Sequence, residues 1–278
     1  MNLGAVLMKK IIINNINKRV VVPAISIAVI LLAVLVAIIT RKPKVSLFEN
    51  VQVTFAGISP DAYVLVQNNW EDEYLGSLYF TADKTTGIVK DDVITVTCQV
   101  TKEELKEHGL RAESLTATYK ADQLNEYVNS TEQVDKQVLA EITNECINTI
   151  TAQTVDTTFR MFYKATKDSS YLREVNNEKA ENIELLNTYF LSNKNNLEAA
   201  GNNYVFLVFK ADISNDNISM PVYFVFTYSD GYITPDGIYE IGRDEPEKRY
   251  DCSVDYQQLY DNNIGIYNGI YEITEIVQ

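Results

Sequence analysis

An uncharged, apolar run near the N-terminus constrains this chain more than any other feature of the sequence. From Val20 to Thr40, 21 consecutive residues carry no charge, and Ser26 and Thr40 are the only ones with a hydroxyl. A helix of this length, at about 1.5 Å per residue, crosses a hydrocarbon core of about 30 Å. Residues 20–40 are therefore predicted to form a transmembrane helix behind a cytoplasmic tail of residues 1–19. The alternative is a buried core helix.

The run is predicted to stay attached as a signal anchor. Its small-x-small triplet, Ser26-Ile27-Ala28, would leave an apolar stretch at the new N-terminus if it were cut. Four cations precede the run and three follow it, and nearly everything that can fold lies after it. We therefore expect a single-pass protein of the cell membrane, with a cytoplasmic N-terminus and residues 45–278 extracytoplasmic.

Charge limits the partners of the remaining chain. All 38 acidic residues follow Lys44, together with 17 of the 24 Lys and Arg, so residues 45–278 carry a net charge of −21. This excess argues against nucleic acid and anionic lipid headgroups as direct partners, because both bind basic surfaces. It fits either simple solubility or a site for cationic ligands.

The cysteine pattern predicts no metal site, and no cofactor is indicated. Cys98, Cys146 and Cys252 are odd in number and show no C-x-x-C spacing. One pair could be oxidised outside a membrane. The other interpretation is that all three are small buried thiols.

Residues 45–124 are predicted to form a small β-sandwich. Runs such as "VQVTF" and "DVITVTCQV" alternate apolar and polar residues and are separated by turn residues at even spacing. Thr101 and Glu104 predict a capping box for a short helix that ends at Gly109. The only histidine, His108, falls in the last exposed turn of that helix, so Ser-His-Asp and Cys-His sites have almost nothing to be built from.

Residues 125–278 are predicted to form an α+β domain, in which one long helix or two consecutive ones pack across one face of a curved antiparallel sheet. Ser130 and Gln133 can cap the helix. From Ile183 onward the period becomes two, in "IELLNTYFLS", "YVFLVFKADI" and "PVYFVFTYS", which is typical of long paired strands. The tail is expected to add a helical turn and a closing strand. The helical stripe has four-residue spacing and consists of Val134, Val138, Ile142, Cys146 and Ile150.

These segments resemble a known class of proteins. "VSLFENVQVTFAGISPDAYVLVQNN", "KDDVITVTCQV" and "GLRAESLTATYKADQL" are similar to the bacterial immunoglobulin-like module of single-pass envelope proteins of Gram-positive bacteria. Residues 125–278 are similar, at the level of fold, to the cystatin-like or nuclear-transport-factor-like domains that end many such proteins. The zinc ribbon that often precedes the span in that class is absent, because no cysteine precedes Cys98. The resemblance implies no catalytic residues.

The stretch "YSDGYITPDGIYEIG" holds the candidate ligand-binding residues. Tyr228, Asp230, Tyr232 and Asp236, with Tyr239 beside them, could line a pocket for a sugar or an amine. Alternatively, each Asp-Gly pair is a turn, because glycine supplies a positive φ and aspartate bonds its own backbone. The spacing of the acids excludes a calcium loop.

The leading functional hypothesis is a non-enzymatic, membrane-anchored extracytoplasmic protein that binds a cell-wall component or another envelope protein. One alternative is an envelope hydrolase that uses two carboxylates, with Asp230 and Asp236 as candidates. Another is an accessory subunit whose span packs against a membrane transporter or kinase.

Overall fold

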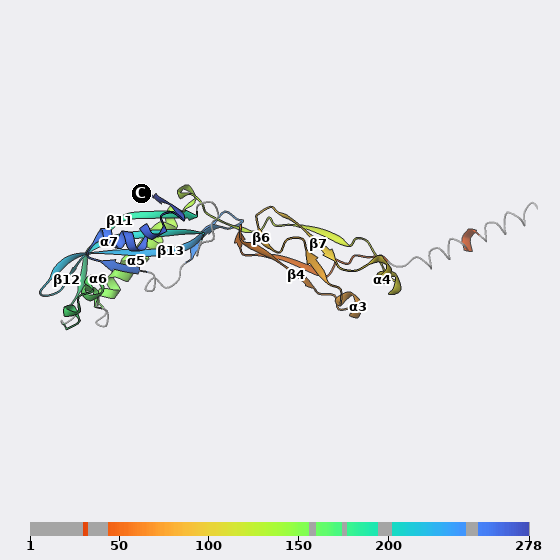
Figure 1. Cartoon of the computed structure of the whole chain (residues 1–278), viewed down its shortest axis with the longest axis horizontal. Helices are drawn as coiled ribbons and strands as arrows, with labels where there is room; N and C mark the ends of the chain where they lie inside the picture. Colours follow the sequence, from red (N-terminus) through yellow and green to blue (C-terminus); the bar gives the residue numbers. More distant parts are fainter. Residues whose placement is uncertain are drawn as a thin grey trace, which may run out of the picture. The chain divides into compact units, whose positions relative to one another are not determined.

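The protein is described from a computed structural model, shown in Figure 1. Strands outnumber helices along the described chain, so the fold is mostly β. The structure describes residues 30–32, 44–155, 160–173, 177–193, 202–242 and 250–277.

The mostly β content corrects the fold class predicted from the sequence. Among the described residues, no helix is both long and apolar enough to cross a membrane. Of the uncharged run, residues 30–32 are described, as helix, and the rest of 20–40 lies outside the described ranges, as does the tail 1–19. The longest described helix, α5 (Lys136–Val155), has the length of a span, but polar residues recur along it. The predicted transmembrane helix, signal anchor and single-pass location at the cell membrane are contradicted by this finding.

An immunoglobulin-like sandwich is not shown by the described residues 45–124. Even spacing of apolar runs indicates strands but not their pairing, because pairing depends on contacts between distant segments. One strand of this region, β3 (Ile58–Ser59), pairs in parallel with β10 (Asn125–Tyr127) in the largest sheet. The others form three small sheets: β2 (Val51–Ala56), β4 (Ala62–Asn68) and β6 (Thr86–Ile88); β5 (Phe80–Ala82), β7 (Val93–Cys98) and β9 (Thr116–Lys120); and β1 (Lys44–Val45) with β8 (Arg111–Ala112).

Two short helices belong to the same region, α3 (Glu73–Gly76) and α4 (Lys102–Glu107). The capping box predicted for α4 is confirmed: Thr101 Oγ1 accepts from the Glu104 amide at 3.1 Å, and Glu104 Oε2 accepts from the Thr101 amide at 2.7 Å. His108 is the C-cap of α4, and its ring stacks on Tyr74 with the centroids 3.5 Å apart. The histidine is thus part of a packed surface contact.

The chain divides into two compact units. Unit 1 comprises Met1–Gln52, Val66–Thr81 and Val96–Ala117, and unit 2 comprises Val53–Leu65, Ala82–Thr95 and Thr118–Gln278. The domain ranges predicted from the sequence, 45–124 and 125–278, stay a prediction.

The centre of unit 2 is an eight-stranded sheet (Figure 1). The three aromatic runs of the sequence form its long antiparallel strands, β11 (Lys179–Asn193), β12 (Asn203–Ser214) and β13 (Ser219–Ile233). β16 (Tyr271–Glu275) pairs with β11 and ends the sheet on that side. β10, β14 (Tyr239–Gly242) and β15 (Tyr250–Ser253) all pair with β13.

One face of this sheet is covered by α5. The predicted stripe is confirmed from Val138 to Ile150: Ile142, Cys146 and Ile150 are at most 1% exposed and pack with inward side chains of β12 and β13. Its first member, Val134, is buried in the same cluster but precedes the helix. The predicted cap of α5, Ser130 with Gln133, is wrong. The helix begins after Asp135, whose Oδ1 accepts from the amides of residues 137 and 138 at 2.7 and 3.0 Å. The short helix α6 (Met161–Thr166) adds Met161 and Phe162 to the same core.

The opposite face is covered as well, by α7 (Tyr256–Asn263) and the C-terminal segment. Residues of β12 alternate between two clusters: Val205, Leu207 and Phe209 pack on the α5 side, whereas Phe206 and Val208 pack with residues of the α7 side. A strand that is apolar at both odd and even positions requires burial on both faces. A helix on one face alone, as predicted, would have left half of β12 in water.

Candidate functional site

Tyr228, the first of the predicted ligand-binding residues, lies in the core. It is 1% exposed, and its hydroxyl is 3.4 Å from Cys146 Sγ of α5. Tyr228 therefore holds α5 against β13.

Asp230 lies within β13, at an irregularity between Ser229 and Tyr232 where the register to β14 shifts. Its φ of 57° is in the left-handed region, which aspartate tolerates better than most residues. The next amide, of Gly231, donates to Asn203 Oδ1 at 2.7 Å. Asp230-Gly231 is therefore a bulge in a continuous strand and not a hairpin turn.

Asp236 lies in the turn between β13 and β14. The Gly237 amide donates to the Thr234 carbonyl at 2.9 Å, and Gly237 has a φ of 83°, which favours glycine. The turn interpretation of this Asp-Gly pair is confirmed. Tyr232 lies on β13 and donates its hydroxyl to the Glu240 carboxylate across the hairpin, a hydrogen bond that raises the Tyr232 pKa.

The four predicted residues are thus distributed over a core position, a bulge, a hairpin surface and a turn. A ligand-binding role for them stays a prediction. A hollow of about 400 Å³ is lined by Ile233, Gly237 and Tyr239 of the same stretch, by Glu132 shortly before α5, and by Asp135 and Lys136 at the start of that helix. We call it the hairpin pocket.

Tyr239 is one of the lining residues of the hairpin pocket. It is 8% exposed, and its hydroxyl is buried without a hydrogen-bond partner among the described residues. Burial raises the Tyr239 pKa, and Asp135 adds to the shift. A Cβ on Gly231 would lie 2.9 Å from this hydroxyl, so the bulge glycine makes room for the tyrosine ring. The pocket is shaped by packing, and its phenol is neutral.

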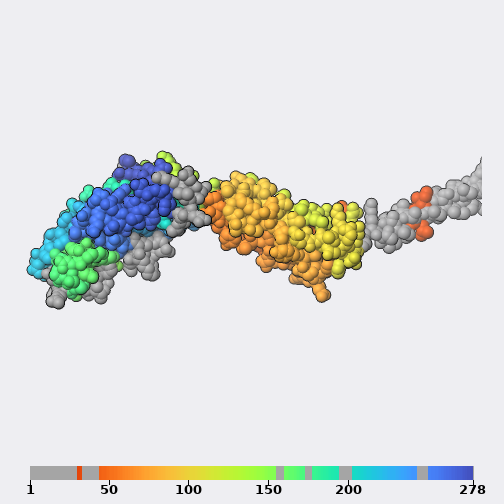
Figure 2. Space-filling view, viewed as in Figure 1, coloured from red at the N-terminus to blue at the C-terminus, as the bar shows by residue number. Residues whose placement is uncertain are grey.

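A second hollow, of about 340 Å³, lies between α5 and the residues after β16. Leu139 and Ala140 of α5 form one wall, and Ile276 and Val277 form the other. Val277 is 87% exposed. Figure 2 shows the dark blue C-terminal residues beside the yellow-green start of α5. We call this hollow the edge groove. It shares Lys136 with the hairpin pocket.

The three cysteines are buried free thiols, which confirms that interpretation of the sequence. Burial raises the pKa of Cys98 to about 11 and those of Cys146 and Cys252 to about 12. Because the thiolate is the reactive form, none of these side chains is an activated nucleophile near neutral pH.

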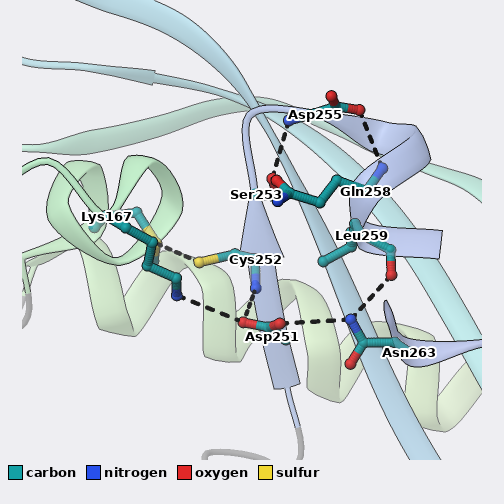
Figure 3. A network of polar contacts seen from close by, with 9 residues as sticks. Lys167, Asp251, Cys252, Ser253, Asp255, Gln258, Leu259 and Asn263 are labelled. Carbon is teal, nitrogen blue, oxygen red and sulfur yellow. Dashed lines mark hydrogen bonds and ion pairs between the residues drawn. The ribbon is translucent and has the colours of Figure 1, made fainter. Parts of the chain in front are cut away.

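The contacts of Cys252 belong to a structural network, shown in Figure 3. Its Sγ lies 4.0 Å from Met161 Sδ, and the neighbouring Asp251 contacts Lys167 Nζ at 4.0 Å and Asn263 Nδ2 at 3.4 Å. These contacts join β15 to the end of α6 on one side and to α7 on the other. The network fixes the strand that connects the two layers covering the sheet.

Neither the described side chains nor sequence relatives identify a chemistry. Within the described ranges, no group of three His, Cys, Asp or Glu could hold a metal ion. No family model, curated protein or solved structure matches the chain. The resemblance to Gram-positive envelope proteins therefore stays a prediction.

Proposed function

We propose that this chain is a binding module that recognises a partner through the edge groove and the hairpin pocket. The observation that carries the proposal is that these two hollows meet at Lys136, at the start of the longest described helix. Together they form a concave surface that is large enough to contact more than one side chain of a partner. The groove volume of about 340 Å³ is near the lower end of the range typical of ligand sites.

The lining of the edge groove favours a protein segment over a glycan. Leu139, Ala140, Ile276 and Val277 supply aliphatic surface, whereas sugars are held by stacked aromatic rings and dense hydrogen bonds. An apolar side chain of a partner would displace water from this surface, at about 25 cal/mol per Å² buried. A cell-wall component, the other partner considered, becomes one outcome of the test.

The polar groups of the hairpin pocket support binding over catalysis. Asp135 accepts two amide hydrogen bonds as the cap of α5. Hydrogen bonds from its own amide and from Ser130 and Thr131 lower the pKa of Glu132, so it is a poor proton donor at neutral pH. The carboxylates considered for glycoside cleavage, Asp230 and Asp236, lie in a bulge and in a turn.

Selection of displayed random peptides of roughly ten residues against the full chain tests the proposal. Ala140→Tyr fills the edge groove from an exposed helix position, and Ala152→Tyr is the matched control on the same helix, about 18 Å further along it. We expect enriched peptides that lose binding to Ala140→Tyr and keep it to Ala152→Tyr. No enrichment, or equal binding to both variants, would refute the proposed function.

A further inference from the structure

We propose that the partner is a basic, extended protein segment that adds as a strand to the outer edge of β16 and places an apolar side chain in the edge groove. This inference rests on the proposed function and specifies its binding mode. It combines backbone groups at the end of the sheet with the hollow beside them. Strand addition of this kind draws affinity from main-chain hydrogen bonds and specificity from pockets for alternate side chains.

The register of β16 determines which backbone groups face outward. Among the described strands, β16 pairs with β11 alone, with Thr274 opposite Phe190. The Ile276 amide donates to the Thr188 carbonyl at 2.8 Å, toward β11. Because inward and outward groups alternate in an antiparallel ladder, Ile273 and Glu275 direct their amides and carbonyls away from the sheet. A partner strand would pair with these groups.

The same alternation places the groove where an added strand would need it. Ile273 packs with the α7 cluster, whereas Ile276 packs with the α5 cluster. Side chains on the α5 side of an added strand would therefore lie next to Ile276 and Val277 and across from Ala140. The backbone edge and the edge groove can be occupied by one extended segment.

Charge selects the kind of partner. The exposed Glu272 and Glu275 give β16 two carboxylates, and no Lys or Arg lies within five residues of the strand in the sequence, on a chain of net charge −14. Asn187 Nδ2 donates to Glu275 Oε1 at 2.8 Å and leaves the carboxylate charged, and the edge groove has one cation in its lining, Lys136 of α5. A second copy of β16 would bring these carboxylates near their own equivalents, which disfavours self-pairing. A segment with Lys or Arg flanking an apolar residue would complement them.

The neighbouring part of β11 does not offer an equivalent edge. Its ladder with β12 is irregular between Glu181 and Glu184 and again between Leu185 and Asn187, and Asn182 has a φ of 50°. Bulges bend a strand and misalign its outward groups. The regular edge at this end of the described sheet is therefore β16.

The probe is a synthetic peptide of the sequence Lys-Val-Thr-Ile-Thr-Val-Lys with blocked ends, added to the full chain. Amide hydrogen exchange by NMR should show new protection at Ile273 and Glu275. The same peptide, N-methylated at alternate residues on its pairing edge, should not bind. Binding should weaken at about 1 M salt, where the screening length is about 3 Å.

Two substitutions at position 275 separate the contribution of the backbone amide to binding from that of the carboxylate. Glu275→Pro deletes an outward amide that an edge strand can spare, and Glu275→Ala keeps the amide while removing the same carboxylate. We expect binding to be about tenfold weaker for the proline variant than for the alanine variant. Proline removes one backbone hydrogen bond to the added strand and disturbs the strand geometry next to it. Circular dichroism checks that both variants are folded, and the exchange experiment on the unsubstituted chain decides if proline is not tolerated.

The outcomes distinguish this inference from the function on which it rests. Peptide binding that is lost in Ala140→Tyr without protection at Ile273 and Glu275 would overturn the strand mode and leave the binding function standing. Displacement of the peptide by soluble peptidoglycan fragments would overturn the protein partner in favour of a glycan. Failure of both the displayed and the synthetic peptides would overturn both proposals.

Discussion

The two faces of the sheet in unit 2 are buried by different means. On the α5 face, a 20-residue helix packs aliphatic and phenylalanine side chains into one large cluster. On the α7 face, a helix of eight residues contributes Leu259, and tyrosine rings supply much of the rest. Tyrosine buries a large ring and keeps a hydroxyl that can remain at the boundary with water. A short, polar helix can therefore cover one face of a sheet when neighbouring tyrosine side chains bury most of the apolar surface.

The first prediction tests which face dominates stability. Phe226→Ala should lower the free energy of unfolding by about 3–5 kcal/mol, because the fully buried ring packs edge-on against Phe209 and on Tyr250. Phe206→Ala on the α7 face should cost nearer the lower end of that range, because the thinner layer can relax into the space. Urea unfolding of both variants measures the difference. Equal losses would contradict the distinction between the faces.

The second prediction concerns the independence of the α7 layer. Leu259→Ala should cost about 2–3 kcal/mol, because Leu259 is 2% exposed and is the aliphatic anchor of α7. Hydrogen exchange should accelerate at the amides of α7 and stay slow in α5, since local opening follows the smaller cluster. Acceleration in both helices would show that the two layers unfold together.

The third prediction uses the thiol on the α5 face. Burial raises the Cys146 pKa from 9.0 to about 12, so above pH 9 the unfolded thiol ionises while the folded one stays neutral. The resulting stability is complete below pH 9 and is lost as pH rises toward 12, by at most about 1.4 kcal/mol per pH unit. Cys146→Ala should flatten the decline in unfolding free energy between these values. An unchanged slope would show that the tyrosines and the other thiols account for it.

The smallest effect is expected from the polar rim of the α7 face. The Tyr256 hydroxyl donates to Asn187 Oδ1 at 3.2 Å and lies 3.1 Å from the Tyr189 hydroxyl. Tyr256→Phe should therefore cost about 1 kcal/mol in thermal or urea unfolding. Tyr79→Phe, at a side chain that is 68% exposed, is the control and should change stability little. If Tyr256→Phe left the free energy of unfolding unchanged, packing of the rings alone would stabilise this layer.

The sequence predicted individual helices and strands better than it predicted which elements they pack against. The spacing of Ile142, Cys146 and Ile150 was sufficient to predict α5, because a 20-residue stripe repeats the signal several times. The expected helical turn and closing strand of the tail are present as α7 and β16. Their place on the second face was missed, because the α7 sequence "YQQLYDNN" has a single aliphatic residue and its tyrosines read as surface.

The four candidate residues and three lining residues of the hairpin pocket come from one stretch of the sequence but from different positions in it. A strand that alternated regularly would have kept Tyr228 and Tyr232 on one face. The bulge at Asp230 interrupts this alternation, and Ile233, Gly237 and Tyr239 line the pocket instead. The dipeptide Asp-Gly occurs both in the bulge and in the turn, so it does not by itself distinguish the two structures. The edge groove was missed because Val277 and Ala140 are 137 positions apart in the chain.

The irregular ladder of β11 also has a consequence for the protein at high concentration. A regular β11 would present a long template onto which other chains could add, copy after copy, as filaments grow. Its bends interrupt that template, and the carboxylates of β16 repel an identical neighbour at the adjoining edge. At this end of the described sheet, both features disfavour filament growth from native molecules, and we expect fibril seeding to follow the small population of unfolded chains.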